Sequence, residues 1–315
     1  MNIENITFDE FIEIYKEDKR GDLKERTLSL KSDITRKHIL PYFTGHTLGS
    51  IGPADIQAWK NTIRTLGYSP SYERTIDNQF TAYISHACTF YGLAPNPCRC
   101  VRKMGRFRNR VDFLTMEEYQ RFLAQCRPGS WEHVIFDTLA FTGMRCGECL
   151  ALTPEDIDIP GRRISITKTY YRRGGEDFVT TPKTEESFRE VAIPAFLAEE
   201  LSEYMAGRPA TARIFSISSE AVGHAMKKRL AGAGIRHLPV HSLRHFFASH
   251  LISMGVDPLT VKEMLGHKDI KITLNTYAHL MPNRQREVTD LLDERAGVLN
   301  GTLPFAFKSR ALENL

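Results

Sequence analysis

The chain has 315 residues, of which 42% are hydrophobic and 25% charged, so it is long enough for two domains of ordinary globular composition. No run approaches the ~20 apolar residues that a transmembrane helix needs. The acidic start, MNIENITFDE, lacks the basic and apolar regions of a signal peptide. These features exclude an integral membrane protein and predict a cytoplasmic one.

The apolar spacing of the first 97 residues predicts a small helical bundle. Helices are expected at 8–19, at 27–40, from residue 53 onward and at 69–91. Pro53 suits the first turn of the third helix. The stretch GLAPNPC at 92–98 ends the pattern.

A basic segment follows the bundle. The net charge is only +4, but the first 110 residues hold 17 Lys and Arg against 12 Asp and Glu. Six of these basic residues fall in CRCVRKMGRFRNR at 98–110, which has no acid. A solvated linker would explain this, and so would binding to a phosphate backbone. The candidate DNA contacts are Arg102, Lys103, Arg106, Arg108 and Arg110.

The remaining sequence predicts a mainly helical domain with a small antiparallel sheet, an α+β fold. Alternating β-branched residues predict strands at 163–171, 178–181 and 188–193. Thr115 and Glu118 form a capping-box pattern at the first helix. Helices are expected at 116–126, 131–142, 194–205, 219–231, 240–255, 258–265, 273–280 and 284–294. The domain boundaries are therefore 1–97 for the bundle, 98–113 for the linker, 114–296 for the second domain and 297–315 for a tail.

Six cysteines suit a reducing compartment as free thiols. Two close pairs, Cys98 with Cys100 and Cys146 with Cys149, could be zinc ligands. The first pair is separated by one residue, where zinc sites use two to four, and the second lies in an apolar helix pattern. H-E-x-x-H, paired-carboxylate, P-loop and Gly-rich nucleotide motifs are absent, so we expect neither a metal nor a cofactor.

Groups that bind or activate a phosphate recur along the second domain. The motif TGMRCGE at 142–148 places Arg145 at a helix-breaking turn, and the motif PKTEES at 182–187 places Lys183 in a turn. HSLRHFFASHL at 241–251 sets His241 and Arg244 three residues apart. LGHKDIKITLNTY at 265–277 sets His267 after Gly266 and ends at Tyr277.

The order and spacing of these motifs resemble those of the tyrosine recombinase (phage integrase) family, over roughly 114–294. The motifs are most similar to those of integrases from prophages and conjugative transposons. The helical bundle resembles the family's SAM-like core-binding domain by architecture. Many such integrases carry a further arm-binding domain at the N-terminus, so we expect either an arm-less type or a truncated sequence.

The resemblance implies metal-free DNA strand cleavage through a covalent 3′-phosphotyrosine. Tyr277 would be the nucleophile, since a phenol of pKa ~10 needs activation before it can attack. Arg145 and Arg244 would clamp the non-bridging oxygens of the phosphate, because guanidinium is planar, bidentate and permanently charged. His241 would take the proton from Tyr277 or bind the phosphate, and His267 would donate a further hydrogen bond to it.

Lys183 would protonate the leaving 5′ oxygen, with Lys168 as its rival, and Glu148 would orient Arg145 or a neighbouring histidine through a buried ion pair. Each residue alone also fits a structural role. Tyr277 could be a core tyrosine, and the arginines could form surface ion pairs. The histidines could be helix caps. Lys183 could be an ordinary turn residue and Glu148 an ordinary helix residue.

The resemblance also implies partners: double-stranded DNA bound through salt-sensitive phosphate contacts, a homo-tetramer in the synaptic complex, and accessory DNA-bending or directionality proteins. The helix at 284–294 would pack on a neighbouring protomer through its apolar face, or else in cis. A type IB topoisomerase-like nicking-closing enzyme and a catalytically inactive DNA-binding regulator are the alternative functions.

Overall fold

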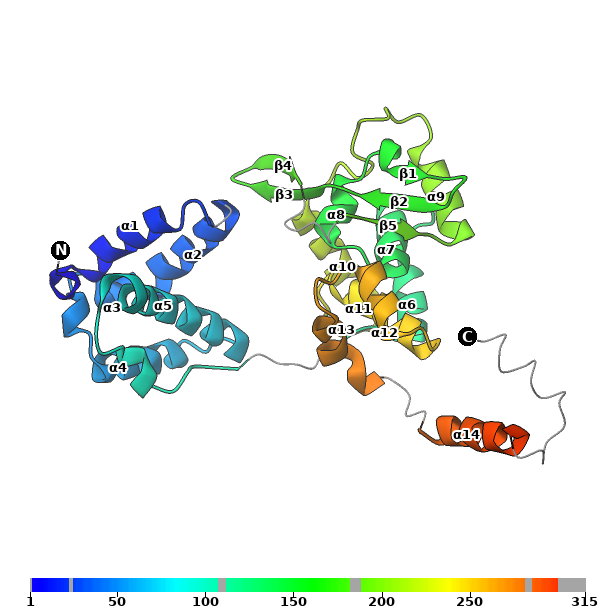
Figure 1. The fold of residues 1–315 in the computed structure, drawn as a ribbon. Helices are drawn as coiled ribbons and strands as arrows, with labels where there is room; N and C mark the ends of the chain where they lie inside the picture. The colour runs from blue at the N-terminus through cyan, green and yellow to red at the C-terminus, as the bar shows by residue number, and fades with distance from the viewer. Residues whose placement is uncertain (1, 23–24, 107–111, 182–187, 281–284, 300–315) are drawn as a thin grey trace. The chain divides into compact units, whose positions relative to one another are not determined.

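Residues 2–22, 25–106, 112–181, 188–280 and 285–299 are described by the computed structural model, and they form two compact units that divide between residues 108 and 109. The chain is mainly helical, with small antiparallel sheets in the second unit, which confirms the predicted fold class (Figure 1). None of the described helices is long and apolar enough to cross a membrane.

The first unit is a helical bundle whose helix starts follow from local capping. Thr7 and Glu10 form a capping box at the first helix, and Ser69 accepts a hydrogen bond from the backbone of Tyr72 at the longest. The elements are η1 (Ile3–Asn5), α1 (Phe8–Asp18), α2 (Glu25–His38), α3 (Leu40–Phe43), η2 (Leu48–Ser50), α4 (Pro53–Thr65), α5 (Pro70–Tyr91) and η3 (Pro97–Cys100).

Aromatic rings form the centre of this bundle. Phe80 lies 4.8 Å from Phe43 and 4.7 Å from Trp59 between ring centroids, and 5.6 Å from Phe8. All four side chains are at most 2% exposed. Each buried ring contributes roughly 1.5–3 kcal/mol of transfer free energy, so this cluster supplies a large share of the bundle's stability.

The start of the basic segment is bound to this bundle. Lys60 Nζ lies 2.8 Å from Asp77 Oδ1, and both side chains are almost fully buried. Asp77 Oδ2 accepts the backbone N–H of Met104 at 3.0 Å, and Lys60 Nζ donates to the carbonyl of Arg102 at 3.1 Å. The chain from residue 98 to residue 104, predicted as linker, is therefore held on the first unit.

The second unit combines helices with five strands among its described residues. The helices are α6 (Met116–Leu123), α7 (Trp131–Thr142), α8 (Cys146–Ala151), η4 (Pro154–Asp156), α9 (Ala195–Met205), α10 (Ser219–Gly232), α11 (Ser242–Ser253), α12 (Pro258–Leu265), α13 (Ile270–Tyr277), η6 (Ala278–Leu280) and α14 (Gln285–Leu299). The strands are β1 (Ile157–Asp158), β2 (Arg163–Ile166), β3 (Thr169–Arg173), β4 (Glu176–Thr180) and β5 (Arg189–Ala192).

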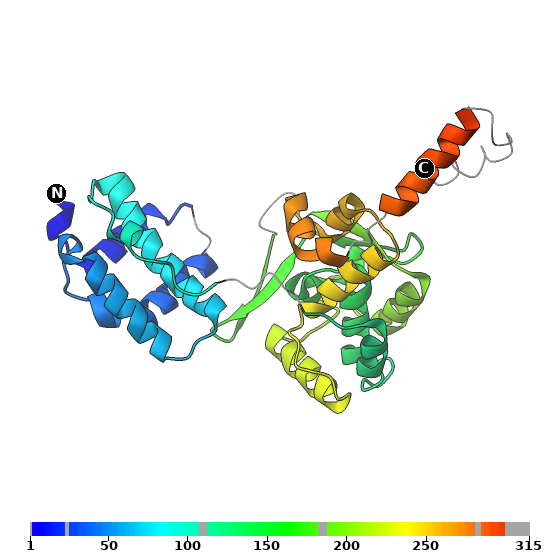
Figure 2. The same cartoon turned by 90° about the horizontal axis from the view of Figure 1, so that it is seen from below.

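The strands form two antiparallel sheets. One has the order β1-β2-β5, and the other is the two-stranded ribbon β3-β4, which projects from the body of the second unit (Figure 2). The prediction of one continuous strand at 163–171 is wrong, since its halves belong to different sheets. Lys168 lies at the break. Its Nζ is 2.8 Å from Asp156 and 3.1 Å from Thr153 Oγ1, which ties this point to the preceding 3₁₀ helix.

Helices α11, α12 and α13 pack side by side around a small apolar cluster separate from the main core (Figure 1). Its buried members include Phe247 and Leu251 from α11, Leu265 from α12 and Tyr277 from α13. The predicted helix at 273–280 begins earlier in the structure, because Asp269 caps α13 by accepting the backbone N–H of Lys271.

Candidate active site

Arg244 connects three helices of the second unit. It lies in the first turn of α11 and is 3% exposed. Its Nη1 donates to the carbonyl of Gly143 and its Nη2 to the carbonyl of Leu265, both at 2.7 Å. These carbonyls lie at the C-terminal ends of α7 and α12, where the helix dipole favours a cation. Arg244 is therefore fixed in position before any ligand binds.

The turn after α7 sets the position of Arg145. Gly143 caps α7 in the left-handed conformation with φ +63°, and Arg145 occupies the N-cap position of α8. Glu148 Oε2 accepts the backbone N–H of Arg145 at 2.9 Å, while its Oε1 lies 2.7 Å from Arg145 Nη1. The Arg145 side chain is 43% exposed, so it can also reach a ligand.

A buried carboxylate holds two arginines together. Glu148 is 4% exposed, and its Oε2 also accepts from Arg189 Nη2 at 2.9 Å. Burial acts to raise the pKa of Glu148, but the charges and hydrogen bonds of Arg189 and Arg145 outweigh it, so the pKa lies below its ordinary value. Arg189 Nε donates to the carbonyl of Met264 at 3.2 Å, which joins β5 to α12.

Two histidines adjoin these arginines. Burial lowers the pKa of His241 to about 4 and that of His267 to about 3, with the charges of Arg244 and Arg145 adding to the effect. His267 follows Gly266, which ends α12 in the left-handed conformation, and its Nδ1 lies 2.8 Å from Thr273 Oγ1. Both rings are therefore neutral near pH 7.

Among the described residues, this site therefore combines three guanidinium groups and two neutral imidazoles with one carboxylate. Such a surplus of positive charge and N–H donors, partly withdrawn from water, is suited to an oxyanion. Burial lowers the pKa of Arg244 to about 9, and the charges of Arg145 and Arg189 add to this effect. A bound anion would relieve this mutual repulsion.

Tyr277 lies beside this cluster, at the end of α13. Its side chain is 1% exposed, so the hydroxyl is buried in this structure. Its Oη lies 2.5 Å from Nδ1 of His245, a residue that the sequence analysis did not select. Burial raises the pKa of Tyr277 to about 12, although the Arg244 charge acts to lower it.

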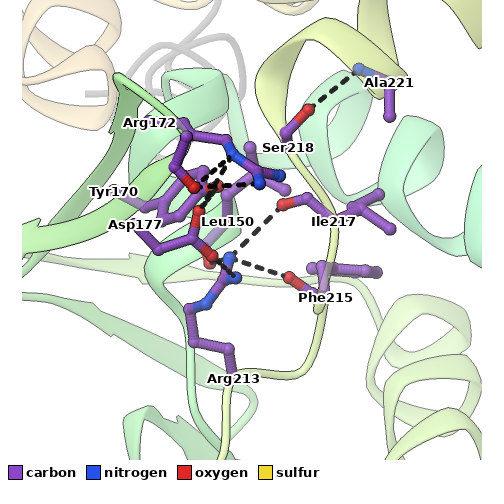
Figure 3. A network of polar contacts seen from close by, with 10 residues as sticks. Leu150, Tyr170, Arg172, Asp177, Arg213, Phe215, Ile217, Ser218 and Ala221 are labelled. Carbon is purple, nitrogen blue, oxygen red and sulfur yellow. Dashed lines mark hydrogen bonds and ion pairs between the residues drawn. The ribbon is translucent and has the colours of Figure 1, made fainter.

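The ribbon β3-β4 precedes Lys183 in the sequence, and the predicted turn at 182–187 with Lys183 lies outside the described residues. Arg213 contacts both strands of the ribbon, at Tyr170 on β3 and Asp177 on β4 (Figure 3). Arg213 Nη2 donates to Asp177 at 3.0 Å, and the guanidinium lies 4.1 Å from the ring centre of Tyr170. Its Nη1 donates to the carbonyl of Leu150 at 3.2 Å, at the end of α8. Arg213 thus connects the ribbon to the helix that follows Arg145.

The other predicted basic residues differ in their surroundings. The rival lysine, Lys168, is engaged by Asp156 and Thr153. Arg102, Lys103 and Arg106 are exposed on the first unit. Arg108 and Arg110 fall outside the described residues.

One group with metal-ligand chemistry occurs among the described residues, namely His133, Asp137 and Glu200, whose ligand atoms lie within 4.8 Å of one another. These side chains have internal partners: His133 Nδ1 lies 2.6 Å from Glu200 Oε1, and the Tyr119 hydroxyl donates to Asp137. The group contains none of the six cysteines, which are free thiols.

Gly143→Ala is expected to destabilise the second unit. An added Cβ would lie 2.4 Å from Phe247 Cδ1 and 2.8 Å from Leu265 Cδ2, at a positive φ. We expect a loss of about 2–4 kcal/mol in the free energy of unfolding, measured by urea denaturation. Gly129→Ala is the matched control, because Gly129 has φ +69° and nothing within 4 Å. Equal losses in the two variants would show that the contacts of Gly143 are unimportant.

Known proteins resemble this chain in sequence and in fold. Residues 112–284 match the group described as "Phage integrase family", and residues 7–63 match "Phage integrase, N-terminal SAM-like domain". The chain is 28% identical to the ICEBs1 integrase of Bacillus subtilis (strain 168), over 92% of this chain and 83% of that protein. It is 27% identical to the integrase of Mycobacterium phage D29, over 88% and 76%.

Two solved structures share the fold. One is the Tn1549 transposon integrase (residues 82–397) in complex with circular intermediate DNA, with a TM-score of 0.76, 20% identity and coverage of 91% of this chain and 100% of that chain. The other is a lambda integrase (residues 75–356) dimer bound to a COC' core site, with a TM-score of 0.65, 17% identity and coverage of 89% and 97%.

Proposed function

Because this chain belongs to the phage integrase family, we propose that it is the site-specific tyrosine recombinase of a mobile element, which integrates or excises that element by cutting and rejoining DNA strands. The observation that carries the proposal is the anion-binding cluster around Arg145 and Arg244, with Tyr277 buried beside it. An inactive DNA-binding regulator is not favoured, since it would have no need of this complete set.

The scissile phosphate would bind between Arg145 and Arg244, whose charges stabilise the negative charge that grows on its non-bridging oxygens during attack. His241 and His267 would donate hydrogen bonds to the same oxygens. Glu148 would position Arg145 through their ion pair. All of these groups belong to the chain itself, so the step uses no cofactor.

Tyr277 Oη would attack the phosphorus, and the bond to the 5′ oxygen would break, which leaves a 3′-phosphotyrosine and a free 5′-hydroxyl. Lys183 would give a proton to the leaving oxygen, because a flexible ammonium whose pKa can fall is suited to general-acid work. The 5′-hydroxyl of a partner strand would then attack the phosphotyrosine and restore a continuous strand. A type IB topoisomerase would share this chemistry without exchanging strands.

The first unit would bind the duplex together with the basic segment, whose exposed Arg102, Lys103 and Arg106 suit phosphate contacts. Strand exchange requires several active sites at once, so the chain would act as a homo-tetramer on two duplexes, aided by DNA-bending or directionality proteins. On α14, Val288, Leu291 and Leu292 are 50%, 53% and 60% exposed, which supports packing on a neighbouring protomer. Since its substrate would be DNA, the chain would act in the cytoplasm.

A suicide substrate tests the proposal. A nick beside the cleavage point, in DNA from the ends of the element that carries this gene, lets the cut strand diffuse away and traps the covalent complex. We expect a slowly migrating band on a denaturing gel for the wild type and for Tyr204→Phe, and none for Tyr277→Phe, which lacks the attacking oxygen. A band from Tyr277→Phe would disprove the nucleophile, and no band from the wild type would contradict the recombinase function.

A further inference from the structure

The hydroxyl of Tyr277 has a hydrogen-bond partner that is not part of the phosphate-binding set. Its Oη lies 2.5 Å from Nδ1 of His245, and the two rings are tilted by 55° with their centres 5.8 Å apart. We propose that His245 is the catalytic base that takes the proton from Tyr277, which leaves His241 free to bind the phosphate. This inference rests on the proposed recombinase function and deepens it.

Helix packing and hydrogen bonds hold both His245 and Tyr277 in place. His245 follows Arg244 on α11, and Arg244 is fixed by carbonyls at the ends of two other helices. Tyr277 is packed in the apolar cluster of α11, α12 and α13. His241 lies one turn before His245, and their rings meet edge to face with centres 4.8 Å apart. The contact between His245 and Tyr277 is therefore a property of the helix packing, and both side chains are largely withdrawn from solvent.

Both groups have the protonation states from which the transfer starts, a neutral imidazole and a protonated phenol. The titratable and charged groups that face the ring are His241 and Arg244 on its own helix and Tyr277 from α13. Burial lowers the pKa of His245 to about 4, with His241 and Arg244 adding to the effect, so the ring is neutral near pH 7. A neutral ring with its hydrogen on Nε2 presents Nδ1 as an acceptor. The pKa of Tyr277, raised to about 12 chiefly by burial, means that solvent alone would rarely ionise it.

The proton balance closes over a full cycle. As the Oη–P bond forms and the bond to the 5′ oxygen breaks, the phenol proton moves to Nδ1 of His245, and Lys183 supplies a proton to the 5′ oxygen. The negative charge of the bound phosphate offsets the repulsion by Arg244 and stabilises the imidazolium. In the rejoining step, a 5′-hydroxyl attacks and gives its proton to neutral Lys183, the Oη–P bond breaks, and His245 returns its proton to Tyr277.

His245→Asn separates proton transfer from positioning. The amide oxygen of Asn takes roughly the place of Nδ1 and can accept the Tyr277 hydrogen bond, but it is too weak a base to take the proton. We expect DNA affinity to be unchanged and the single-turnover rate of covalent-complex formation to fall by about 10²–10⁴-fold. The matched control is His241→Asn, one turn earlier on the same helix.

The pH profile supplies a second readout. The wild-type rate is expected to change little from about pH 6 to about pH 8, because neutral His245 is populated throughout and Arg244 stays charged. In His245→Asn the phenol must ionise into solvent, and the ionised fraction of a group with pKa about 12 grows about tenfold per pH unit, so the rate should rise in proportion. His241→Asn should reduce the rate without this slope, as expected for a phosphate ligand.

A substrate with sulfur in place of the bridging 5′ oxygen separates the base from the acid, since a thiolate leaves without protonation. His245→Asn should stay slow on this substrate, whereas Lys183→Ala should recover. A His245→Asn rate within threefold of the wild type, or a pH profile without the slope, would overturn the role of His245. Failure of the wild type to form any covalent complex would instead contradict the recombinase function.

Discussion

Arg244→Lys is expected to reduce the single-turnover rate of covalent-complex formation by about 10³-fold, because one donor group to the transition-state oxyanion commonly contributes 10²–10³-fold. Lysine keeps the positive charge. However, its single ammonium cannot span the carbonyls of Gly143 and Leu265, which the guanidinium binds with separate nitrogens at 2.7 Å. The charge would therefore remain while the planar fork that positions it is lost.

The same substitution has a structural readout. At least one of the two helix-end carbonyls would lose its partner, at a cost of about 1–3 kcal/mol for a buried acceptor, so the thermal midpoint of unfolding should fall. Arg229→Lys is the matched control, since Arg229 pairs with Glu132 at 2.5 Å at a partly exposed site. It should leave the rate unchanged. If Arg244→Lys also retained the wild-type rate, bidentate binding by Arg244 would be refuted.

Strong local signals surround the predicted site residues Arg145 and His267 in the sequence. Gly143 and Gly266 end their helices in the left-handed conformation, with φ of +63° and +65°, so the backbone turns where the motifs indicate. Such positions depend on neighbours in the chain, and periodicity together with glycine chemistry is enough to find them. The helical bundle was predictable for the same reason.

Contacts between distant segments could not be found in this way. Arg189 lies in a short strand and reads as an ordinary alternating residue, and only the packing of β5 against α8 and α12 brings it to Glu148 and to Met264. His245 had one usable signal, its spacing of four residues from His241, which places both on one helical face. The sequence does not specify which of these histidines faces Tyr277, because that depends on where α13 docks.

The division of the strands between two sheets could not be predicted from the sequence either. The alternating pattern of 163–171 continues through Thr167 and Lys168, so no local signal marks a break. The ion pair of Lys168 with Asp156 is a tertiary contact at the point where the chain leaves the three-stranded sheet for the ribbon. Likewise, the clamp that Arg213 forms on Asp177 joins residues far apart in the sequence.

Glu148→Gln is expected to destabilise the second unit by about 3 kcal/mol, because neutralising one member of a buried ion pair removes the attraction that offsets the cost of burying the other. The Arg189 side chain is 7% exposed, and the carboxylate of Glu148 forms ion pairs with both Arg189 and Arg145. Glutamine keeps the size and one acceptor oxygen but not the charge. Glu190→Gln is the control, since Glu190 and its partner Arg163 are both more than 60% exposed and such pairs contribute little.

The loss should depend on pH in a defined direction. Because the pKa of Glu148 is lower in the folded chain, its stabilisation is fully present above the unfolded value of about 4.3 and disappears as the pH falls through the folded pKa. The difference in unfolding free energy between wild type and Glu148→Gln should therefore be constant near neutral pH and shrink below about pH 4. Urea denaturation across this range measures it. A difference that stayed the same on acidification would mean that Glu148 acts through its shape and hydrogen bonds, and not through its charge on Arg145 and Arg189.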